Sequence, residues 1–299
     1  MQLNSEVITT PPQASATVVL LRDAPQKGLQ VFLLRRHSAS AVLGGVYVFP
    51  GGKLDEADCA PTLHAHLDTS PQAMHQALGE PDLPLHTAAG LYVAAVREVL
   101  EECGVLYARL HGDQALVHVA EQRKKWQQQL HEGQSFADVL QTSGLQVDTQ
   151  HLTPWSRWIT PIQPSVTTKR FDTRFFMAVL PEGQSPIHDN IEATDSLWLG
   201  PREALDRYWD GHLLLAPPQI MTLVSLLPHT RTDQVLAAAR QQTPAVILPE
   251  TFDDEDGVRT MCYPGDPRHS VPQRAMRGPT RLRFVQGRFE PLSGFGAFL

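Results

Sequence analysis

The chain has 299 residues, 42% of them hydrophobic and 19% charged, which is enough to bury a core and ordinary for a globular protein. A formal net charge of −7 argues against a nucleic-acid-binding surface as its main feature. Three scattered cysteines exclude a disulfide framework and favour a reducing compartment, here the cytoplasm. No apolar run reaches the roughly 18 residues that a membrane span needs, and neither end of the chain resembles a signal segment or a peroxisomal address.

The first part of the chain predicts a β-hairpin followed by a glycine-rich loop. Residues 1–14 are polar and are expected to be flexible. Residues 16–22 and 29–35 are rich in β-forming side chains and are joined by a polar turn. A strand at 46–49 leads into Pro-Gly-Gly at 50–52, where the glycines allow the backbone to approach another segment or a phosphate closely.

A proline-rich segment follows at residues 59–89. Its prolines exclude one long helix, although residues 71–78 could form a short one. We expect the segment to be a flap beside the functional site, because long loops tend to carry specificity.

The stretch 94–106 carries the most distinctive pattern, an amphipathic helix followed by a short extended run. Glu98, Glu101 and Glu102 fall on the face opposite to its apolar residues, and Gly104 is expected to end the helix. Like charges at this spacing destabilise a bare helix, so the stripe calls for a counter-cation. Clustered carboxylates are the ligands that Mg²⁺ or Mn²⁺ prefers; the alternative interpretation is a solvated acidic face.

The rest of the chain alternates helices and strands. Residues 113–140 predict mostly helix, and the second half of 169–180 predicts a strand. Pro201 opens a helix, and 217–227 and 232–242 predict two more. Beyond the main domain, 15–243, strands are expected at 245–249, 257–263 and 280–291, so that 244–299 form a β-rich extension packed on that domain.

The succession of strand, glycine-rich loop, acidic helix and strand resembles the Nudix box. Gly52, Arg97, Glu98, Glu101, Glu102 and Gly104 match that signature in place. Two features depart from it. Asp58 stands where the family has Glu, and residues 59–89 are an insertion that splits the box. The Trp-x-x-Trp at 155–158 and the Arg-Phe-Asp-Thr at 170–173 are similar to the branch that includes the peroxisomal coenzyme A diphosphatase.

This resemblance implies an α/β/α sandwich around a mixed sheet and a Mg²⁺- or Mn²⁺-dependent hydrolase. The expected reaction cleaves the diphosphate of a nucleoside diphosphate derivative, taking coenzyme A or acyl-CoA to 3',5'-ADP and (acyl-)4'-phosphopantetheine. Hydrolysis of NADH, ADP-ribose or a nucleotide sugar is one alternative, and a non-catalytic nucleotide-binding sensor is another. The expected partner is therefore a small nucleotide, and many relatives are homodimers.

The resemblance also implies roles for single residues. Glu98, Glu101 and Glu102 would hold the metal, with Glu98 also catalytic and Arg97 orienting a box carboxylate. Glu192 is expected to be a further ligand or base, with Asp189 and Asp195 as alternatives. The candidate substrate contacts are Arg35, Gly51, Gly52, Arg170 and Phe171, although Arg35 could be a charged strand end and Phe171 a core ring.

Overall fold

The computed structural model describes residues 1, 3–40, 42–112, 117 and 119–299. A mixed sheet of eight strands lies at its centre, in the order β10-β7-β8-β1-β2-β3, with β4 paired to β1 and β9 to β2. β1 runs parallel to β8 and β7 parallel to β10, and the other pairs are antiparallel. Its strands are β1 (Gln13–Ala24), β2 (Gly28–Arg36), β3 (Tyr47–Val48), β4 (Gly51–Lys53), β7 (Thr153–Ile159), β8 (Phe171–Val179), β9 (Ala193–Leu199) and β10 (Ala245–Ile247).

The two strands of the predicted hairpin separate beyond their turn. β1 pairs with β2 over residues 21–24, but its residues 15–17 pair with β4. β2 in turn pairs with β3 at residues 34 and 35. The segment from β3 to β4, with its Pro-Gly-Gly turn, therefore lies in the opening between β1 and β2.

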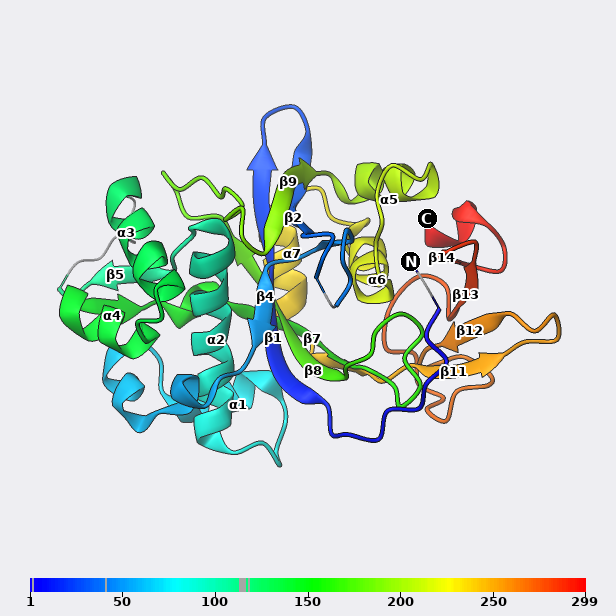
Figure 1. Cartoon of the computed structure of the whole chain (residues 1–299), viewed down its shortest axis with the longest axis horizontal. Helices are drawn as coiled ribbons and strands as arrows, with labels where there is room; N and C mark the ends of the chain where they lie inside the picture. The colour runs from blue at the N-terminus through cyan, green and yellow to red at the C-terminus, as the bar shows by residue number, and fades with distance from the viewer. Residues whose placement is uncertain (2, 41, 113–116, 118) are drawn as a thin grey trace.

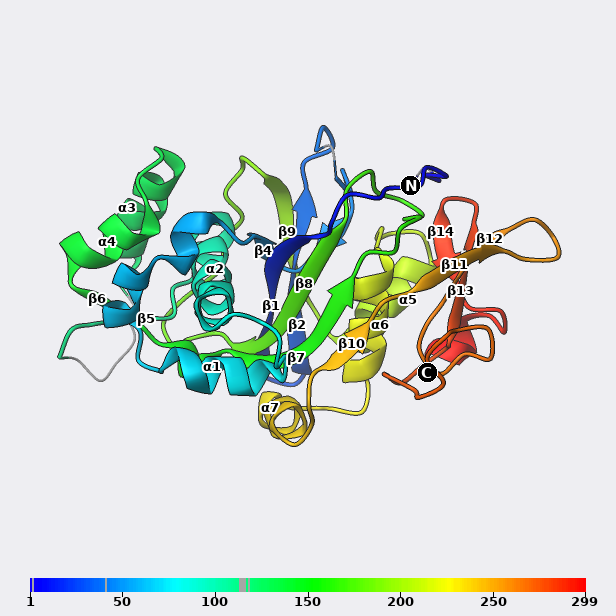
Figure 2. The same cartoon turned by 90° about the horizontal axis from the view of Figure 1, so that it is seen from below.

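Helices cover both faces of the sheet. Successive residues of a strand face opposite sides, so one strand contributes side chains to both cores. Ala16, Val18 and Leu20 of β1 belong to one buried core with α2, whereas Val19 and Leu21 belong to a second core with α5, α6 and α7. Figures 1 and 2 show α2 on one side of the strands and α5 and α6 on the other. The predicted α/β/α sandwich is confirmed. These helices are α2 (Leu85–Cys103), α5 (Pro201–Trp209), α6 (Pro217–Leu226) and α7 (Thr232–Arg240).

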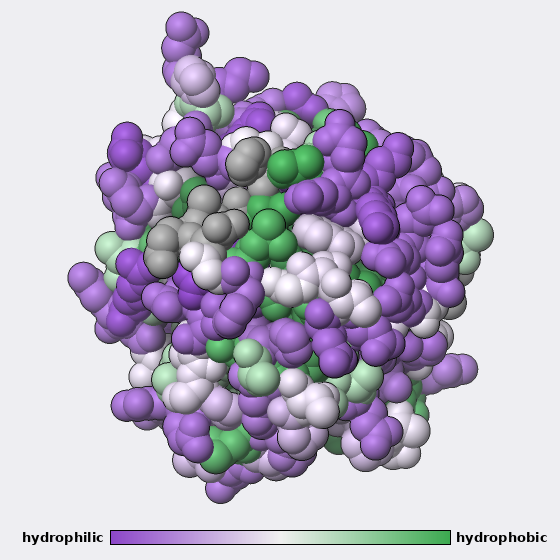
Figure 3. Space-filling model, turned by 90° about the vertical axis from the view of Figure 1, so that its left-hand side faces the viewer, coloured by the Kyte–Doolittle hydropathy of each residue, from purple (hydrophilic) through white to green (hydrophobic). Residues whose placement is uncertain are grey.

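An outer layer of short helices and strands covers the side of α2 that faces away from the sheet. The predicted helix over 113–140 is interrupted, because Ser135 accepts the N–H of Asp138 and begins a separate helix. Residues 113–116 and 118 of that prediction lie outside the described part of the chain. Figure 3 shows this end of the molecule, where hydrophilic residues surround small apolar areas. The outer elements are α1 (Pro71–Leu78), α3 (Ala120–His131), α4 (Phe136–Ser143), β5 (Ala108–Leu110) and β6 (Leu145–Val147).

The insertion at 59–89 packs on α2 through a few buried side chains, so it is not the free flap that the proline-rich composition suggested. Leu63, Met74 and Leu78 are buried with α2 in the first core. Glu80 forms ion pairs with Arg157 of β7, at 2.8 Å, and with Arg174 of β8, at 2.5 Å. The end of the insertion forms the start of α2, which begins at Leu85. The apolar residues between the prolines hold the segment against α2, and Glu80 ties it to the sheet.

The C-terminal segment forms a second, antiparallel sheet that packs on the second core. Met261, Leu282 and Phe289 are buried together with residues of α5, α6 and α7. β10 lies within the predicted extension, yet it is the edge strand of the large sheet. The expected boundary at residue 244 therefore precedes the last strand of that sheet. The strands of the second sheet are β11 (Glu250–Asp253), β12 (Arg259–Cys262), β13 (Arg281–Val285) and β14 (Arg288–Glu290).

The described part of the N-terminal segment is held in place rather than free. The backbone N–H groups of Asn4 and Ile8 donate to the carbonyls of Ser165 and Ile162, at 2.8 and 2.7 Å. These bonds lay the segment along the loop between β7 and β8, which the polar composition of residues 1–14 did not predict. Among the described helices, none is long and apolar enough to cross a membrane.

Candidate active site

The acidic face of α2 points toward the opening between β1 and β2. The helix ends at Gly104, whose own N–H donates to the carbonyl of Leu100 at 3.0 Å. Its φ of 67° turns the chain so that the N–H of Val105 donates back to the carbonyl of Val99 at 3.4 Å. The side chains of Glu98 and Glu101 are 14% and 24% exposed, and Glu102 is buried. A solvated acidic face is therefore excluded, and the three carboxylates lie in a largely desolvated site.

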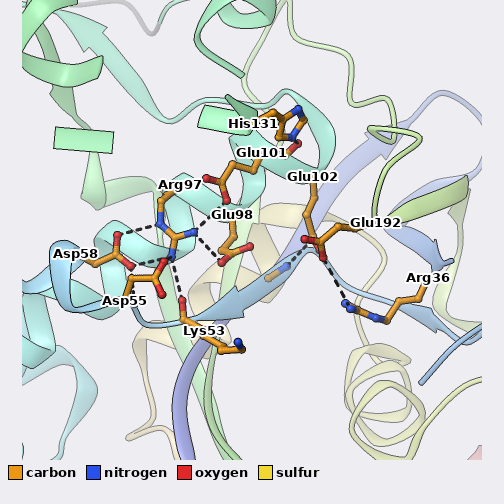
Figure 4. Close-up of polar contacts among 11 residues, drawn as sticks. Arg36, Lys53, Asp55, Asp58, Arg97, Glu98, Glu101, Glu102, His131 and Glu192 are labelled. Carbon is orange, nitrogen blue, oxygen red and sulfur yellow. Dashed lines mark hydrogen bonds and ion pairs between the residues drawn. The ribbon is translucent and has the colours of Figure 1, made fainter. Parts of the chain in front are cut away.

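Arg97 connects this face to the first half of the box (Figure 4). Its Nε and Nη2 donate to both oxygens of the buried Asp58, at 2.9 and 2.7 Å. Its Nη1 donates to Glu98 and Glu101, at 2.8 and 3.0 Å. Its Nη2 also donates to the carbonyl of Lys53, at 2.9 Å. The shorter Asp58 thus holds Arg97 in a two-point contact, and the guanidinium fixes the directions of two box carboxylates.

The glycine-rich turn touches the same carboxylates. The N–H of Gly51 donates to Glu102 Oε2 at 2.8 Å, and Gly51 has a φ of +154°. A Cβ on Gly52 would lie 2.3 Å from Glu98 Oε1, and one on Gly51 would lie 2.3 Å from the carbonyl oxygen of Ala16. Position 51 therefore requires glycine, because a Cβ there would meet the backbone of β1, whereas a Cβ on Gly52 would displace the carboxylate of Glu98.

Burial raises the pKa values of all three carboxylates and so disfavours their charged forms. Desolvation raises the pKa of Glu98 to about 7; Arg97 opposes this rise, and the charges of Glu101 and Glu192 add to it. Desolvation also raises the pKa of Glu102 well above its usual range, with a further contribution from Glu98, partly offset by the N–H of Gly51. A cation between these groups would relieve both effects.

Glu192 reaches the cluster from the loop before β9. Its carboxylate lies 3.8 Å from Arg36 Nη2, and its charge acts on both Glu98 and Glu102. The two alternatives are engaged elsewhere. Asp189 accepts backbone N–H groups of its own loop, and Asp195 accepts the hydroxyl of Tyr47 at 2.6 Å.

Arg35, the residue we selected on β2, lies on the wrong face for this cluster. It is exposed, and its cross-strand neighbours are Tyr47 and Asp195. Arg36 shares the face of Leu34 and points to Glu192 instead. Both arginines end the same strand. The choice between them depended on whether the odd-numbered or the even-numbered residues of β2 face α2.

The other two candidate substrate contacts lie apart from the carboxylates. Arg170 donates to the backbone carbonyls of Thr160 and Thr10, at 3.0 and 3.1 Å. It braces the loop before β8, and no described contact brings it to the cluster. Phe171 lines a cavity of about 180 Å³ on the second face of the sheet, which Thr17 also borders.

The donor set suits a hard divalent ion, although it is not preformed. No three Asp, Glu, His or Cys side chains among the described residues are arranged as a ready metal site. Glu98, Glu102 and Glu192 nevertheless act on one another electrostatically, and Glu98 and Glu101 share one nitrogen of Arg97. The cluster holds more carboxylates than neighbouring cationic side chains, and carboxylate oxygens are the donors that Mg²⁺ and Mn²⁺ prefer.

Comparison with known proteins gives the family. The NUDT19 Nudix domain family matches residues 7–226, which include both halves of the split box and Glu192. The chain belongs to this Nudix family. It is 28% identical to the acyl-coenzyme A diphosphatase NUDT19 of Xenopus laevis, over 66% of this chain and 59% of that protein. The chain thus matches less than two thirds of that relative's length. With the protein of the same name from Gallus gallus it shares 26% identity, over 86% of this chain and 81% of that protein.

A solved structure supports the same family. The NUDIX hydrolase from Alicyclobacillus acidocaldarius superimposes with a TM-score of 0.64 at 28% identity, covering 77% of this chain and 97% of that one. The Nudix fold therefore accounts for most of the chain.

Proposed function

We propose that this Nudix protein is a divalent-metal-dependent diphosphatase that hydrolyses coenzyme A or acyl-CoA to 3',5'-ADP and (acyl-)4'-phosphopantetheine. The observation that carries the proposal is the desolvated group of Glu98, Glu101 and Glu102, held by Arg97 and by the N–H of Gly51. Such a group is costly to keep charged unless a cation joins it.

Each residue of the cluster has a separate role in this proposal. Glu98, Glu101 and Glu102 would hold Mg²⁺ or Mn²⁺, which stabilises charge on a diphosphate oxygen and activates water. Arg97 orients Glu98 and Glu101 through charge-assisted hydrogen bonds. Glu98 and the exposed Glu192 are the two residues proposed to accept a proton from water.

The choice of substrate rests on the relatives and on the branch motifs. The similar proteins of Xenopus laevis and Gallus gallus carry the name acyl-coenzyme A diphosphatase. Of the residues that carry the branch resemblance, Trp155, Trp158 and Phe171 lie on the second face of the sheet, and Arg170 lies in the loop before β8. These observations favour coenzyme A over other nucleoside diphosphate derivatives.

The proposal is tested by identifying products by mass. The protein is incubated with Mg²⁺ and, separately, coenzyme A, an acyl-CoA, NADH, ADP-ribose and a nucleotide sugar. We expect 3',5'-ADP from the coenzyme A compounds alone. AMP from NADH or ADP-ribose, with coenzyme A untouched, would leave the metal chemistry in place and overturn the substrate. Binding of these compounds without any product would instead indicate a sensor.

A further inference from the structure

An uncharged cavity lies on the second face of the sheet, beside the carboxylate cluster. Its volume is about 180 Å³, and its walls come from β7, β8, the loop between them and the start of α6. Phe171, Phe175 and Ile159 give it apolar surface, and no charged side chain lines it. It therefore suits an uncharged group and disfavours a phosphate.

Three residues that line this cavity each carry a buried polar atom with no hydrogen-bond partner among the described residues. The atoms are Trp158 Nε1, Ser165 Oγ and Gln219 Oε1. The residues that carry them are 5%, 2% and 7% exposed. Buried polar groups normally find a partner, because burying one without a hydrogen bond is costly. Three of the eight such side-chain atoms in the described chain thus gather around one cavity.

The three atoms have complementary chemistry. The indole N–H of Trp158 can only donate, Gln219 Oε1 can only accept, and the hydroxyl of Ser165 can do both. The rings of Phe175 and Tyr263, whose centroids lie 6.4 and 5.9 Å from that of Trp158, hold the indole in place. A ligand with a carbonyl, an N–H or hydroxyl, and apolar carbon between them would satisfy all three.

The cavity adjoins the candidate active site through two segments. Thr17, on its wall, is the cross-strand neighbour of Gly51, whose N–H binds Glu102. Val42, also on its wall, accepts a hydrogen bond through its carbonyl from Arg36 Nε at 3.1 Å. A molecule with its diphosphate at the carboxylates could therefore extend into the cavity.

We propose that this cavity holds the pantoyl end of the phosphopantetheine arm, which makes it the subsite for the half of the substrate that leaves without the nucleoside. The inference rests on the proposed function. Next to its phosphate, this arm carries two methyl groups, a hydroxyl and an amide, and no charge. Trp158 would donate to the amide carbonyl, and Gln219 would accept from the hydroxyl or the amide N–H. The 3',5'-ADP half carries phosphate on both sides of its ribose, for which the cavity offers no cation.

Two substitutions test the subsite, Ser165→Ala and Gln219→Leu, with Ser156→Ala as the matched control. Ser156 is also buried, and its hydroxyl also lacks a partner, but it lines a different cavity. We expect each test substitution to raise KM for coenzyme A roughly threefold to tenfold, as for a lost hydrogen bond, with kcat within about twofold. Calorimetric titration should show weaker binding of 4'-phosphopantetheine and unchanged binding of 3',5'-ADP. The control should change neither.

Both test substitutions should leave the melting temperature unchanged or higher, because each removes an unpartnered polar atom. Weaker binding of 3',5'-ADP with intact binding of phosphopantetheine would overturn the proposal and assign the cavity to the nucleoside. Unchanged binding of both products would show that the cavity holds no substrate. Failure of the unsubstituted protein to hydrolyse coenzyme A would refute the proposed function, and the titration with phosphopantetheine would still decide the role of the cavity.

Discussion

At the scale of single residues, Arg97 holds the site together. It is nearly buried and contacts Asp58, Glu98 and Glu101 at once. We expect Arg97→Ala to lower the free energy of unfolding by about 3–5 kcal/mol, because Asp58 would be left as a buried, unpaired charge. Urea denaturation measures this loss. Arg202→Ala is the control, since its ion pair with Asp206 is exposed and should contribute less than about 1 kcal/mol. Equal losses for the two variants would contradict this role of Arg97.

The raised pKa of Glu98 makes the stability of the metal-free protein depend on pH. A folded-state pKa of about 7, above the ordinary value, means that the folded protein binds more protons than the unfolded chain between those two values. Stability should therefore fall as pH rises through this window. In EDTA, the melting temperature should drop more between pH 5 and pH 8 for the unsubstituted protein than for Glu98→Gln. Parallel curves would show that Glu98 is not desolvated as described.

The residues of the site were predictable where the chemistry is local. The acidic stripe, Arg97 and the terminating Gly104 follow from spacing within one helix. The sequence could not tell whether Arg35 or Arg36 faces the carboxylates, because alternation along a strand gives two faces without saying which one meets α2. Trp158, Ser165 and Gln219 belong to three segments that only the tertiary fold brings together.

At the scale of elements, β4 needs its glycines to fit between β1 and α2. Gly52→Ala would place a methyl group at the position of the Glu98 carboxylate and displace it. We expect kcat to fall on the order of 100-fold, as for loss of a group that stabilises developing charge. Gly296→Ala is the control, because a Cβ there meets no atom within 4 Å. Steady-state kinetics with coenzyme A gives both values, and full activity of Gly52→Ala would contradict the close approach.

The insertion is anchored to the sheet by charge as well as by apolar contacts. Glu80 pairs with Arg157 and Arg174, and Arg174 is only 3% exposed. Glu80→Gln should cost about 3 kcal/mol of unfolding free energy, because it leaves buried positive charge with less compensation. Glu203→Gln, which removes an exposed pair with Arg207, is the control in the same urea experiment. A negligible effect of Glu80→Gln would favour a loosely attached insertion.

Elements with a strong local pattern were predictable, and their environment was not. The short helix at 71–78, opened by Ser70 and Pro71, has the predicted bounds. Its burial in the core depends on Met74 and Leu78 meeting α2, a contact between segments that local periodicity does not report. For the same reason, β10 is an edge strand of the large sheet although the composition changes before it.

At the scale of the whole molecule, two cores lie on opposite faces of one sheet. The acidic helix belongs to the first core, and the C-terminal sheet packs on the second. The segment with β3 and β4 lies in the opening between β1 and β2. The carboxylates lie near this opening on the α2 face of the sheet, and the uncharged cavity lies near it on the opposite face. A diphosphate at the opening would thus have the metal ligands on one face and a place for an uncharged arm on the other.

The most direct test of this account compares release of 3',5'-ADP from coenzyme A by the unsubstituted protein, Glu102→Gln and Glu56→Gln. Glu56 is an exposed carboxylate outside the cluster. With Mg²⁺, we expect Glu102→Gln to lose turnover on the order of 100-fold while still binding nucleotide, and Glu56→Gln to be unchanged. EDTA should abolish turnover in all three. Full turnover by Glu102→Gln, or by the unsubstituted protein in EDTA, would contradict a metal held by this cluster.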